Sequence, residues 1–242
     1  MFRIRFAGLL LLACVFTSQV KAQLFPIVGI QVKPIIPSQL FSNNTFSSLA
    51  DNVKFTLTPQ VGYNFGMIIR KAVYKGISIE SGLTYTQRRY GVSATDSSGF
   101  SSSSTFRMVT YEIPVMALFY IHIAPDDYID GAFGGSADFT ASDVETKNDN
   151  IDALTKLKYF ILPGLNAALG YEHRTKKNGY FYIGGSYHRM LTTLAYTKIA
   201  LQHDLKYSEI IVPLNGHYFA LDFKYFFPVN DKKVKAEDQN AY

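Results

Sequence analysis

Apolar and polar residues alternate along residues 76–88, GISIESGLTYTQR. Ile77, Ile79, Leu83 and Tyr85 fall on one face of an extended chain, and the positions between them are polar or glycine. A two-residue period of this kind predicts a β-strand with one apolar face and one polar face.

The same alternation recurs in seven further segments, so that the sequence predicts eight strands. The eight segments are residues 25–33, 53–69, 76–90, 106–121, 128–140, 157–172, 179–194 and 213–227. Several exceed the roughly 5–6 residues usual in globular proteins and suit the ~9–11 tilted residues that cross a bilayer. In the second segment, the pattern places Phe55 and Leu57 on the apolar face together with Val61, Tyr63 and Phe65.

Short and long connectors alternate between these segments. Residues 70–75, 122–127 and 173–178 are short connectors, and residues 34–52, 91–105, 141–156 and 195–212 are long ones. This rhythm is typical of a membrane barrel with short periplasmic turns and long extracellular loops. The predicted fold is therefore all-β, a single transmembrane up-and-down antiparallel β-barrel of eight strands. Ten strands are the alternative, if residues 34–52 or 195–212 contain a hairpin.

The long loops are rich in serine and asparagine, notably residues 97–104. Segments with so little apolar content are not expected to hold one conformation on their own.

The first residues have the features of an export signal. Arg3 and Arg5 precede a short apolar run at residues 6–16, and Ala22-Gln23 forms a cleavage site. We expect residues 1–22 to be a signal peptide, residues 23–228 the barrel and residues 229–242 a hydrophilic periplasmic tail. A lipoprotein signal with Cys14 lipidated is the alternative interpretation.

Composition supports a membrane location and argues against one class of partner. The chain has 17 Tyr, 19 Phe and no Trp, and membrane barrels place such rings at the two water–lipid boundaries. Loss of Arg3, Arg5 and Lys21 with the signal lowers the formal net charge from +5 to +2, which gives no support to a nucleic-acid partner.

Charged residues on the polar faces are the main candidate site. Because side chains nearly fill an eight-stranded barrel, carboxylates there must be paired or hydrated. We expect a structural interior network; a narrow proton or ion path is the alternative. Its predicted members are Glu80, Arg88, Glu112, Asp130, Glu172, Asp222 and Lys224.

Candidate catalytic and metal sites are weak, and we expect neither an enzyme nor a cofactor. Ser186 and His188 share an interior face but are two residues apart on a strand, roughly 6–7 Å, which is ordinary polar filling. The remaining pairs are His203-Asp204 in a long loop and Asp126-Asp127 in a short turn on the opposite side. Asn148, Asn150 and Asp152 have the alternate spacing of a calcium loop, but its glycine and closing glutamate are absent.

Five local motifs stand out along the chain: Ala22-Gln23, Val28-Gly29-Ile30, Gln60-Val61-Gly62-Tyr63, Ile79-Glu80-Ser81-Gly82-Leu83-Thr84-Tyr85 with its extension Gln87-Arg88-Arg89-Tyr90, and Tyr111-Glu112-Ile113-Pro114-Val115. With these motifs the chain resembles one family, the small outer-membrane β-barrels common in Bacteroidota and often labelled PorT-like. The Tyr-x-Ile-Pro strand start is the most specific, and the resemblance covers residues 23–228. The chain departs from many barrels in that 15 residues follow Phe227.

The resemblance implies a Gram-negative outer-membrane location and carries over no functional residue. We expect a non-enzymatic surface or scaffold protein with a filled polar lumen. Expected partners are outer-membrane lipid, lipopolysaccharide and a protein held by the long extracellular loops or the tail. A subunit of a secretion or uptake assembly is the alternative, and a membrane-embedded hydrolase ranks third.

Overall fold

Strands make up most of the described chain. The computed structural model describes residues 26–36, 45–74, 76–140, 143–147, 150–175, 177–203 and 206–228, so the predicted signal peptide and tail lie outside the described residues. The strands are β1 (Ile27–Ile36), β2 (Phe46–Ala50), β3 (Val53–Tyr74), β4 (Ile77–Thr95), β5 (Ser101–Ala124), β6 (Asp127–Thr140), β7 (Val144–Lys147), β8 (Ile151–Leu157), β9 (Ile161–Thr175), β10 (Gly179–Met190), β11 (Ala195–His203), β12 (Lys206–Leu214) and β13 (Tyr218–Phe226). Among these residues, no helix reaches the length and apolar character that a membrane crossing requires.

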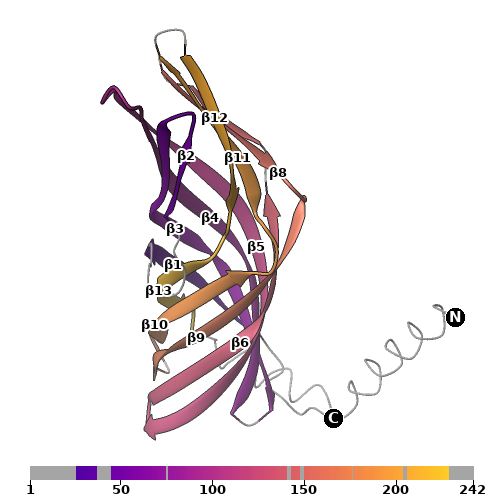
Figure 1. Ribbon diagram of the computed structural model, residues 1–242. Helices are drawn as coiled ribbons and strands as arrows, with labels where there is room; N and C mark the ends of the chain where they lie inside the picture. The colour runs from indigo at the N-terminus through magenta and orange to yellow at the C-terminus, as the bar shows by residue number, and fades with distance from the viewer. Residues whose placement is uncertain are drawn as a thin grey trace, which may run out of the picture.

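Eight of the strands form a closed antiparallel barrel (Figure 1). Hydrogen-bonded neighbours run in the order β1-β13-β10-β9-β6-β5-β4-β3, and β1 pairs with β3 as well as with β13. This ladder confirms the predicted all-β antiparallel barrel. Residues 34–52 and 195–212, which could have added two strands to the barrel wall, do contain strands. However, β2 pairs only with the first residues of β3, and β11 and β12 belong to a separate sheet.

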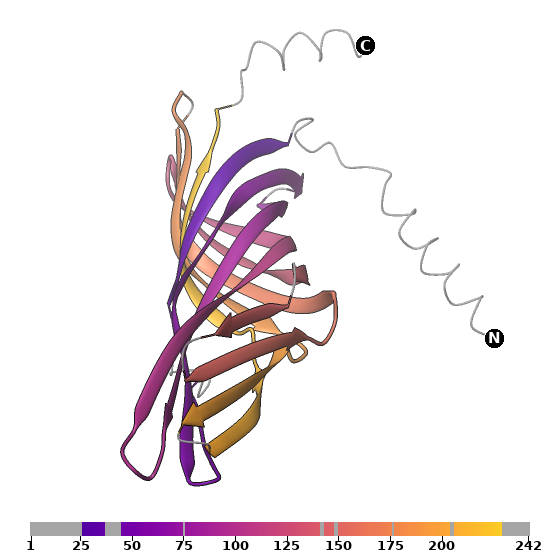
Figure 2. The ribbon, with the colours of Figure 1, turned by 90° about the horizontal axis from the view of Figure 1, so that it is seen from above.

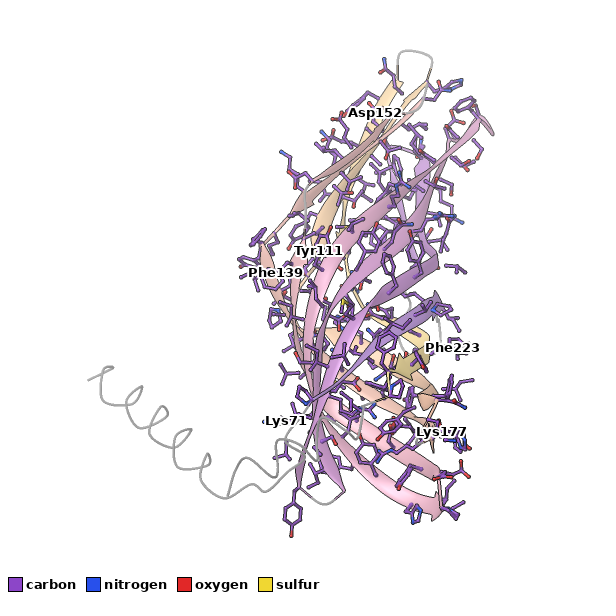
Figure 3. All side chains as sticks on the ribbon, turned by 180° about the vertical axis from the view of Figure 1, so that it is seen from behind. Lys71, Tyr111, Phe139, Asp152, Lys177 and Phe223 are labelled. Carbon is purple, nitrogen blue, oxygen red and sulfur yellow. The ribbon has the colours of Figure 1, made fainter. Side chains whose placement is uncertain are left out.

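The facing predicted for residues 76–88 is confirmed in β4. Ile79 and Leu83 are exposed on the outer surface, whereas Glu80 and Thr84 are buried inside. Other strands follow the same rule, as the exposed Tyr111 of β5 and Phe223 of β13 illustrate (Figure 3). The barrel is thus apolar outside and polar inside, the reverse of a soluble protein.

The facing predicted for residues 53–58 is wrong, because a β-bulge interrupts β3. The pairing of β3 with β4 shifts register between Gln60 and Tyr63, where three steps on β3 match two on β4. One extra residue reverses which side chains point inward. Phe55 and Leu57 are therefore buried inside, while Val61 lies exposed on the outer surface.

Above the bulge lies a second, folded part of the molecule, which we call the cap. It comprises β2, β7, β8, β11 and β12 and the ends of β3, β4 and β5 at residues 53–59, 89–95 and 101–108. Strands β12, β11, β8 and β7 form a four-stranded sheet, and its tips lie at the same end as the β2–β3 and β4–β5 hairpins (Figure 2).

An apolar core holds the cap together. Phe55, Val92, Phe106, Ile199 and Val212 come from five strands and pack in one buried cluster. The expectation that the long loops hold no single conformation is therefore wrong for the described residues. The inward face of β4 changes from polar at Arg88 to apolar at Tyr90, Val92 and Ala94, and it is this change that gives the cap a core.

The opposite end of the barrel carries the three tight connections. They join Tyr74 to Ile77, Ala124 to Asp127 and Thr175 to Gly179. Lys71 and Lys177 lie toward this end, and Asp152 of β8 lies at the cap end (Figure 3). The predicted alternation of short and long connectors is therefore present in the fold.

Candidate functional site: the polar lumen

All seven charged residues that the sequence places inside are buried in the lumen. Glu80 and Arg88 come from β4, Glu112 from β5, Asp130 from β6, Glu172 from β9, and Asp222 and Lys224 from β13. The structure divides six of them between two clusters and a smaller contact, whereas Asp130 is buried with its Oδ2 atom lacking a hydrogen-bond partner among the described residues. It also adds charged residues that sequence reasoning omitted, namely Lys33, Arg70, Asp138, Arg174 and His188.

The lower cluster, near the tight turns, is built around Arg70. Its guanidinium donates to Glu80 Oε2 at 2.8 Å through Nη2 and to Glu172 through Nη1. Lys224 Nζ donates to Glu80 Oε1 at 2.5 Å, and Arg174 Nε donates to Glu172 Oε1 at 2.6 Å. Each of the two carboxylates therefore bridges two cations, which is how buried charges are tolerated.

Aromatic rings close the lower end around these cations. Arg70 lies 4.0 Å from the ring centre of Phe226, and Arg174 lies 4.3 Å from Tyr120 and 4.1 Å from Tyr128. Such contacts stabilise a guanidinium on its flat faces, where it has no hydrogens to donate. Rings and cations therefore pack against one another inside the barrel at this level.

The upper cluster lies just below the cap. His188 Nδ1 is 2.7 Å from Asn166 Oδ1, and its Nε2 is 3.3 Å from Asp138 Oδ2. Glu112 accepts from Asn166 at 3.0 Å and from the Tyr218 hydroxyl at 2.9 Å. The His188 ring also stacks on Tyr218 with centres 4.8 Å apart. The cluster thus joins β5, β6, β9, β10 and β13 across the barrel.

A smaller contact lies on the same inner surface. Asp222 accepts from Ser186 Oγ at 2.6 Å and pairs with Lys33 Nζ at 3.3 Å. Ser186 and His188 therefore bind different partners, and the structure does not bring them together as a nucleophile and its base. A proton-transfer pair requires direct contact near 3 Å.

The upper cluster contains the one grouping among the described residues with metal-ligand character. Ligand atoms of Glu112, Asp138 and His188 lie within 4.8 Å of one another. However, Glu112 lies 3.6 Å from Nδ1 of the imidazole and Asp138 lies 3.3 Å from Nε2, so the carboxylates sit at opposite ring nitrogens. A single ion takes one ring nitrogen, and Arg88 already lies 3.6 Å from Asp138. The geometry fits an ion-pair network better than a metal centre.

The candidate residues outside the lumen have structural partners. His203 stacks on Phe100 and lies 3.4 Å from Asp96, which ties the tip of β11 to the β4–β5 turn. Hydrogen bonds from the Ser98 hydroxyl, the Phe100 and Ser98 amides and His203 lower the pKa of Asp96. Asp127 accepts from Tyr171 and contacts His173 Nδ1 at 2.6 Å. Asp204 and Asn148 lie outside the described residues.

Two of the omitted lumen residues, Asp138 and His188, lay on interior faces that the alternation predicted, whereas Arg70 did not. Asp138 alternates with Phe139 on the interior face of its strand, so its pattern carried the signal. Arg70 stood at the start of a predicted turn, but β3 continues to Tyr74 and keeps it inside. His188 was noted on the interior face but was considered as a catalytic base.

Outward-facing aromatic rings complete the picture of the barrel wall. Tyr63, Phe65, Tyr85 and Tyr111 contact one another across three strands on the cap side. Phe181, Tyr225 and Phe227 form a second group near the turn end. Between them the outer surface carries aliphatic side chains such as those at Leu83 and Leu169. Aromatic groups at the two edges of an apolar band are the surface of a membrane barrel.

Comparison with known proteins agrees with this surface. Residues 40–231 match the family model described as "Outer membrane protein beta-barrel domain". The chain belongs to this family. Among solved structures, this outer-membrane barrel is similar to the outer membrane protein OprG from Pseudomonas aeruginosa, with a TM-score of 0.53 and 12% sequence identity. The similarity covers 84% of this chain and 96% of OprG, and at this identity it concerns the fold alone. No match was found among curated proteins.

Proposed function

We propose that this outer-membrane barrel is a non-enzymatic surface protein, in which the barrel anchors a folded extracellular cap that makes the contacts. The observation that carries the proposal is the lumen. The lower cluster spans it with Arg70, Glu80, Glu172 and Lys224, each held by a charged partner. A lumen filled in this way leaves the outer surface and the cap as the parts available to partners.

Ion conduction tests this proposal directly. We expect the purified protein in planar lipid bilayers to show no stepwise conductance at neutral pH, because charged side chains bridge the lumen at two levels. The Arg70→Ala and Glu80→Ala double variant, which empties part of the lower cluster, serves as the comparison. Regular single-channel steps from the unaltered protein would overturn the proposal of a surface protein with a filled lumen, and they would favour the narrow ion path.

A second candidate function, a subunit of a secretion or uptake assembly, is favoured by the outer face of the cap. Tyr196, Tyr207 and Ile211 are exposed there on β11 and β12, with Lys198 and Glu209 paired beside them. Exposed apolar side chains with a polar rim are typical of protein contact sites. The PorT-like resemblance points in the same direction, because one named member of that group resembles a secretion-system component.

Crosslinking in whole cells separates the two functions. A photoreactive residue at Ile211 should capture one protein in constant ratio if the barrel belongs to an assembly. A photoreactive residue at Lys54 of β3, which is exposed on the cap but outside this sheet, provides the control. Absence of a stoichiometric product from Ile211, with normal insertion, supports the independent surface protein.

Lipopolysaccharide is the proposed lipid partner, and a pair of arginines supports it. Arg89 of β4 and Arg107 of β5 are direct cross-strand neighbours, and both are exposed on the outer surface. They lie four residues beyond Tyr85 and Tyr111, another direct pair, toward the cap. Like charges directly opposite on a sheet repel each other, and a phosphate between them relieves that repulsion.

Neutralising these arginines should weaken lipopolysaccharide binding. Each cation near a charged membrane surface contributes about 1 kcal/mol, so the Arg89→Gln and Arg107→Gln double variant should bind roughly tenfold or more weakly. Surface plasmon resonance of the detergent-solubilised protein over immobilised lipopolysaccharide measures this. Lys54→Gln with Lys156→Gln removes the same charge from the cap and should change little. An equal loss in both double variants would refute a specific arginine site.

A further inference from the structure

The cap has a seam between β5 and β7. The ladder that joins β5 to β6 ends at Thr110. Beyond it, among the described residues, the cap part of β5 pairs with β4 alone. Strand β7 pairs with β8 and lies against β5 without a ladder between them. The two strands therefore meet here through side chains.

A groove of about 640 Å³ lies at this seam. One wall is formed by β4 and β5, including Arg89 and Arg107, and the other by residues 143–146, including Asp143 and Glu145. Pockets for small ligands usually have volumes of roughly 300–1,000 Å³. All four charged side chains are exposed, so that a ligand arriving from outside can reach them.

The two walls of the groove carry opposite charge. Arg89 and Arg107 are direct cross-strand neighbours, and no ion pair holds either of them among the described residues. Across the groove, Asp143 Oδ1 accepts from the Leu157 amide at 2.9 Å, which fixes that carboxylate at the start of β7. Glu145 lies on the same wall. The groove therefore presents two cations on one side and two carboxylates on the other.

This arrangement suits a ligand that carries both charges. Two adjacent guanidiniums bind phosphate oxygens well, because phosphate offers several acceptors and more negative charge than a single carboxylate. The carboxylates on the opposite wall favour an ammonium group. Val109 and Val144 also line the groove and offer apolar surface to a short alkyl link. The matching chemistry is a phosphate joined to an ammonium through a few methylene groups, as in phosphoethanolamine.

The height of the groove favours a phosphate that belongs to a lipid. Arg89 and Arg107 lie four residues beyond Tyr85 and Tyr111, which is about 13 Å along a tilted strand. Figure 3 shows Tyr111 below the cap end, which Asp152 marks. Headgroups add about 10–15 Å in total to a hydrocarbon core of ~30 Å. The groove therefore lies at the outer limit of the headgroup layer, within reach of lipid phosphates.

We infer that this groove binds lipopolysaccharide whose lipid A phosphate bears phosphoethanolamine, with phosphate on Arg89 and Arg107 and the ammonium on Asp143 and Glu145. The inference rests on the proposed lipopolysaccharide partner and on an orientation with the cap outside the cell. It goes beyond that proposal, because an unsubstituted phosphate has no group for the β7 wall. The protein should therefore discriminate between the two forms of the lipid.

Surface plasmon resonance of the detergent-solubilised protein measures this discrimination. Two forms of one lipopolysaccharide are immobilised, one with unsubstituted lipid A phosphate and one to which a purified transferase has added phosphoethanolamine. The unaltered protein should bind the modified form roughly fivefold more tightly, the effect expected of an exposed charge pair. EDTA is present throughout, so that no divalent ion bridges phosphate and carboxylates.

The Asp143→Asn and Glu145→Gln double variant should lose this preference and still bind the unsubstituted form at least as tightly. Asparagine at position 143 keeps the oxygen that accepts from the Leu157 amide, so the start of β7 should stay in place. Asp152→Asn with Glu209→Gln is the control. It removes the same charge from exposed positions of β8 and β12 outside the groove, and it should keep the preference.

The outcomes separate this inference from the function on which it rests. Equal binding of both forms by the unaltered protein, or a preference that persists in the Asp143 and Glu145 variant, overturns the inference and leaves the lipopolysaccharide partner in place. Absence of binding to either form overturns both.

A competition measurement keeps the test decisive if the double variant fails to fold, which heat-modifiable gel mobility reveals. Soluble O-phosphoethanolamine should displace the unaltered protein from the modified lipid at a lower concentration than ethyl phosphate, which has the same phosphate and no ammonium. Equal potency of the two competitors overturns the inference.

Discussion

At the scale of single residues, Gly62 determines how β3 and β4 approach each other beside the bulge. A Cβ at this position would lie 2.3 Å from the Gln87 carbonyl oxygen and 3.4 Å from the Arg88 Cα. Both are backbone atoms, which cannot rotate away as a side chain can. The glycine therefore permits the register shift that turns Phe55 and Leu57 inward.

Gly62→Ala should destabilise the barrel for this reason. Overpacking of this kind costs roughly 1–3 kcal/mol, and we expect a loss of that size in urea unfolding in lipid vesicles. Gly131→Ala is the matched control, since a Cβ there meets nothing within 4 Å. Equal stability of the two variants would show that the strands move apart freely at Gly62.

The interior charges show what alternation can predict for single residues and what it cannot. Glu80, Glu112 and Glu172 each alternate with outward apolar neighbours, so their inward facing followed from the sequence. Which cation reaches which carboxylate did not follow, because Arg70 and Glu172 are 102 residues apart and meet only across the closed barrel. That Arg88 Nε and Nη2 are buried without a hydrogen-bond partner among the described residues is likewise visible only in three dimensions.

At the scale of elements, the outer face of β4 is the surface on which the membrane location can be tested. Leu83 is 56% exposed, and its direct neighbour on the adjacent strand β3, Met67, is exposed as well. Both lie in the aliphatic band between the two aromatic groups. Lipid tails are the solvent that makes such exposure favourable.

Leu83→Arg should therefore impair insertion or stability by ~2–4 kcal/mol, the usual cost of a cation at the middle of the bilayer. Reversible unfolding in vesicles measures it. Thr95→Arg adds the same charge to an exposed position at the cap end of the same strand and should cost little. A negligible effect at Leu83 would contradict the lipid-facing assignment.

The elements of the cap were less accessible to sequence reasoning than the wall. Wall strands contain enough alternating positions to be recognised one by one, whereas β7 and β8 are short. The apolar residues of these short strands are buried only because β3, β4 and β5 extend beyond the barrel and pack against them. The bulge in β3 added to the difficulty, because alternation continues on both sides of it and conceals the reversal.

At the scale of the whole molecule, the barrel has a polar interior and the cap has an apolar interior, and the same long strands pass through both. The lumen is held by ion pairs such as Arg70–Glu80, and the cap by apolar packing around residues such as Ile199. Strands β3, β4 and β5 run through both. The cap should therefore loosen on its own when its core is damaged, while the barrel stays closed.

Ile199→Ala should show this separation. Ile199 is fully buried in the cap core, and removing such a side chain costs about 2–5 kcal/mol. We expect faster hydrogen exchange and protease cleavage in β8, β11 and β12, with unchanged heat-modifiable mobility. Ile211→Ala, on the exposed face of β12, is the control. Unaltered exchange in the cap of Ile199→Ala would mean that the apolar cluster does not hold it.

The pairing of β1 with β13 also determines the order in which the molecule can be built. Ile27–Ile36 and Tyr218–Phe226 stand at opposite ends of the described chain, so the wall closes only after the whole chain has been delivered. Every cap segment lies between them, and in the proposed orientation, with the cap outside the cell, each must cross the bilayer before closure. A folded cap could not thread through, so we expect its apolar residues to travel unpaired through the periplasm. The step most exposed to aggregation would then precede insertion, and a periplasmic chaperone would be needed at that step.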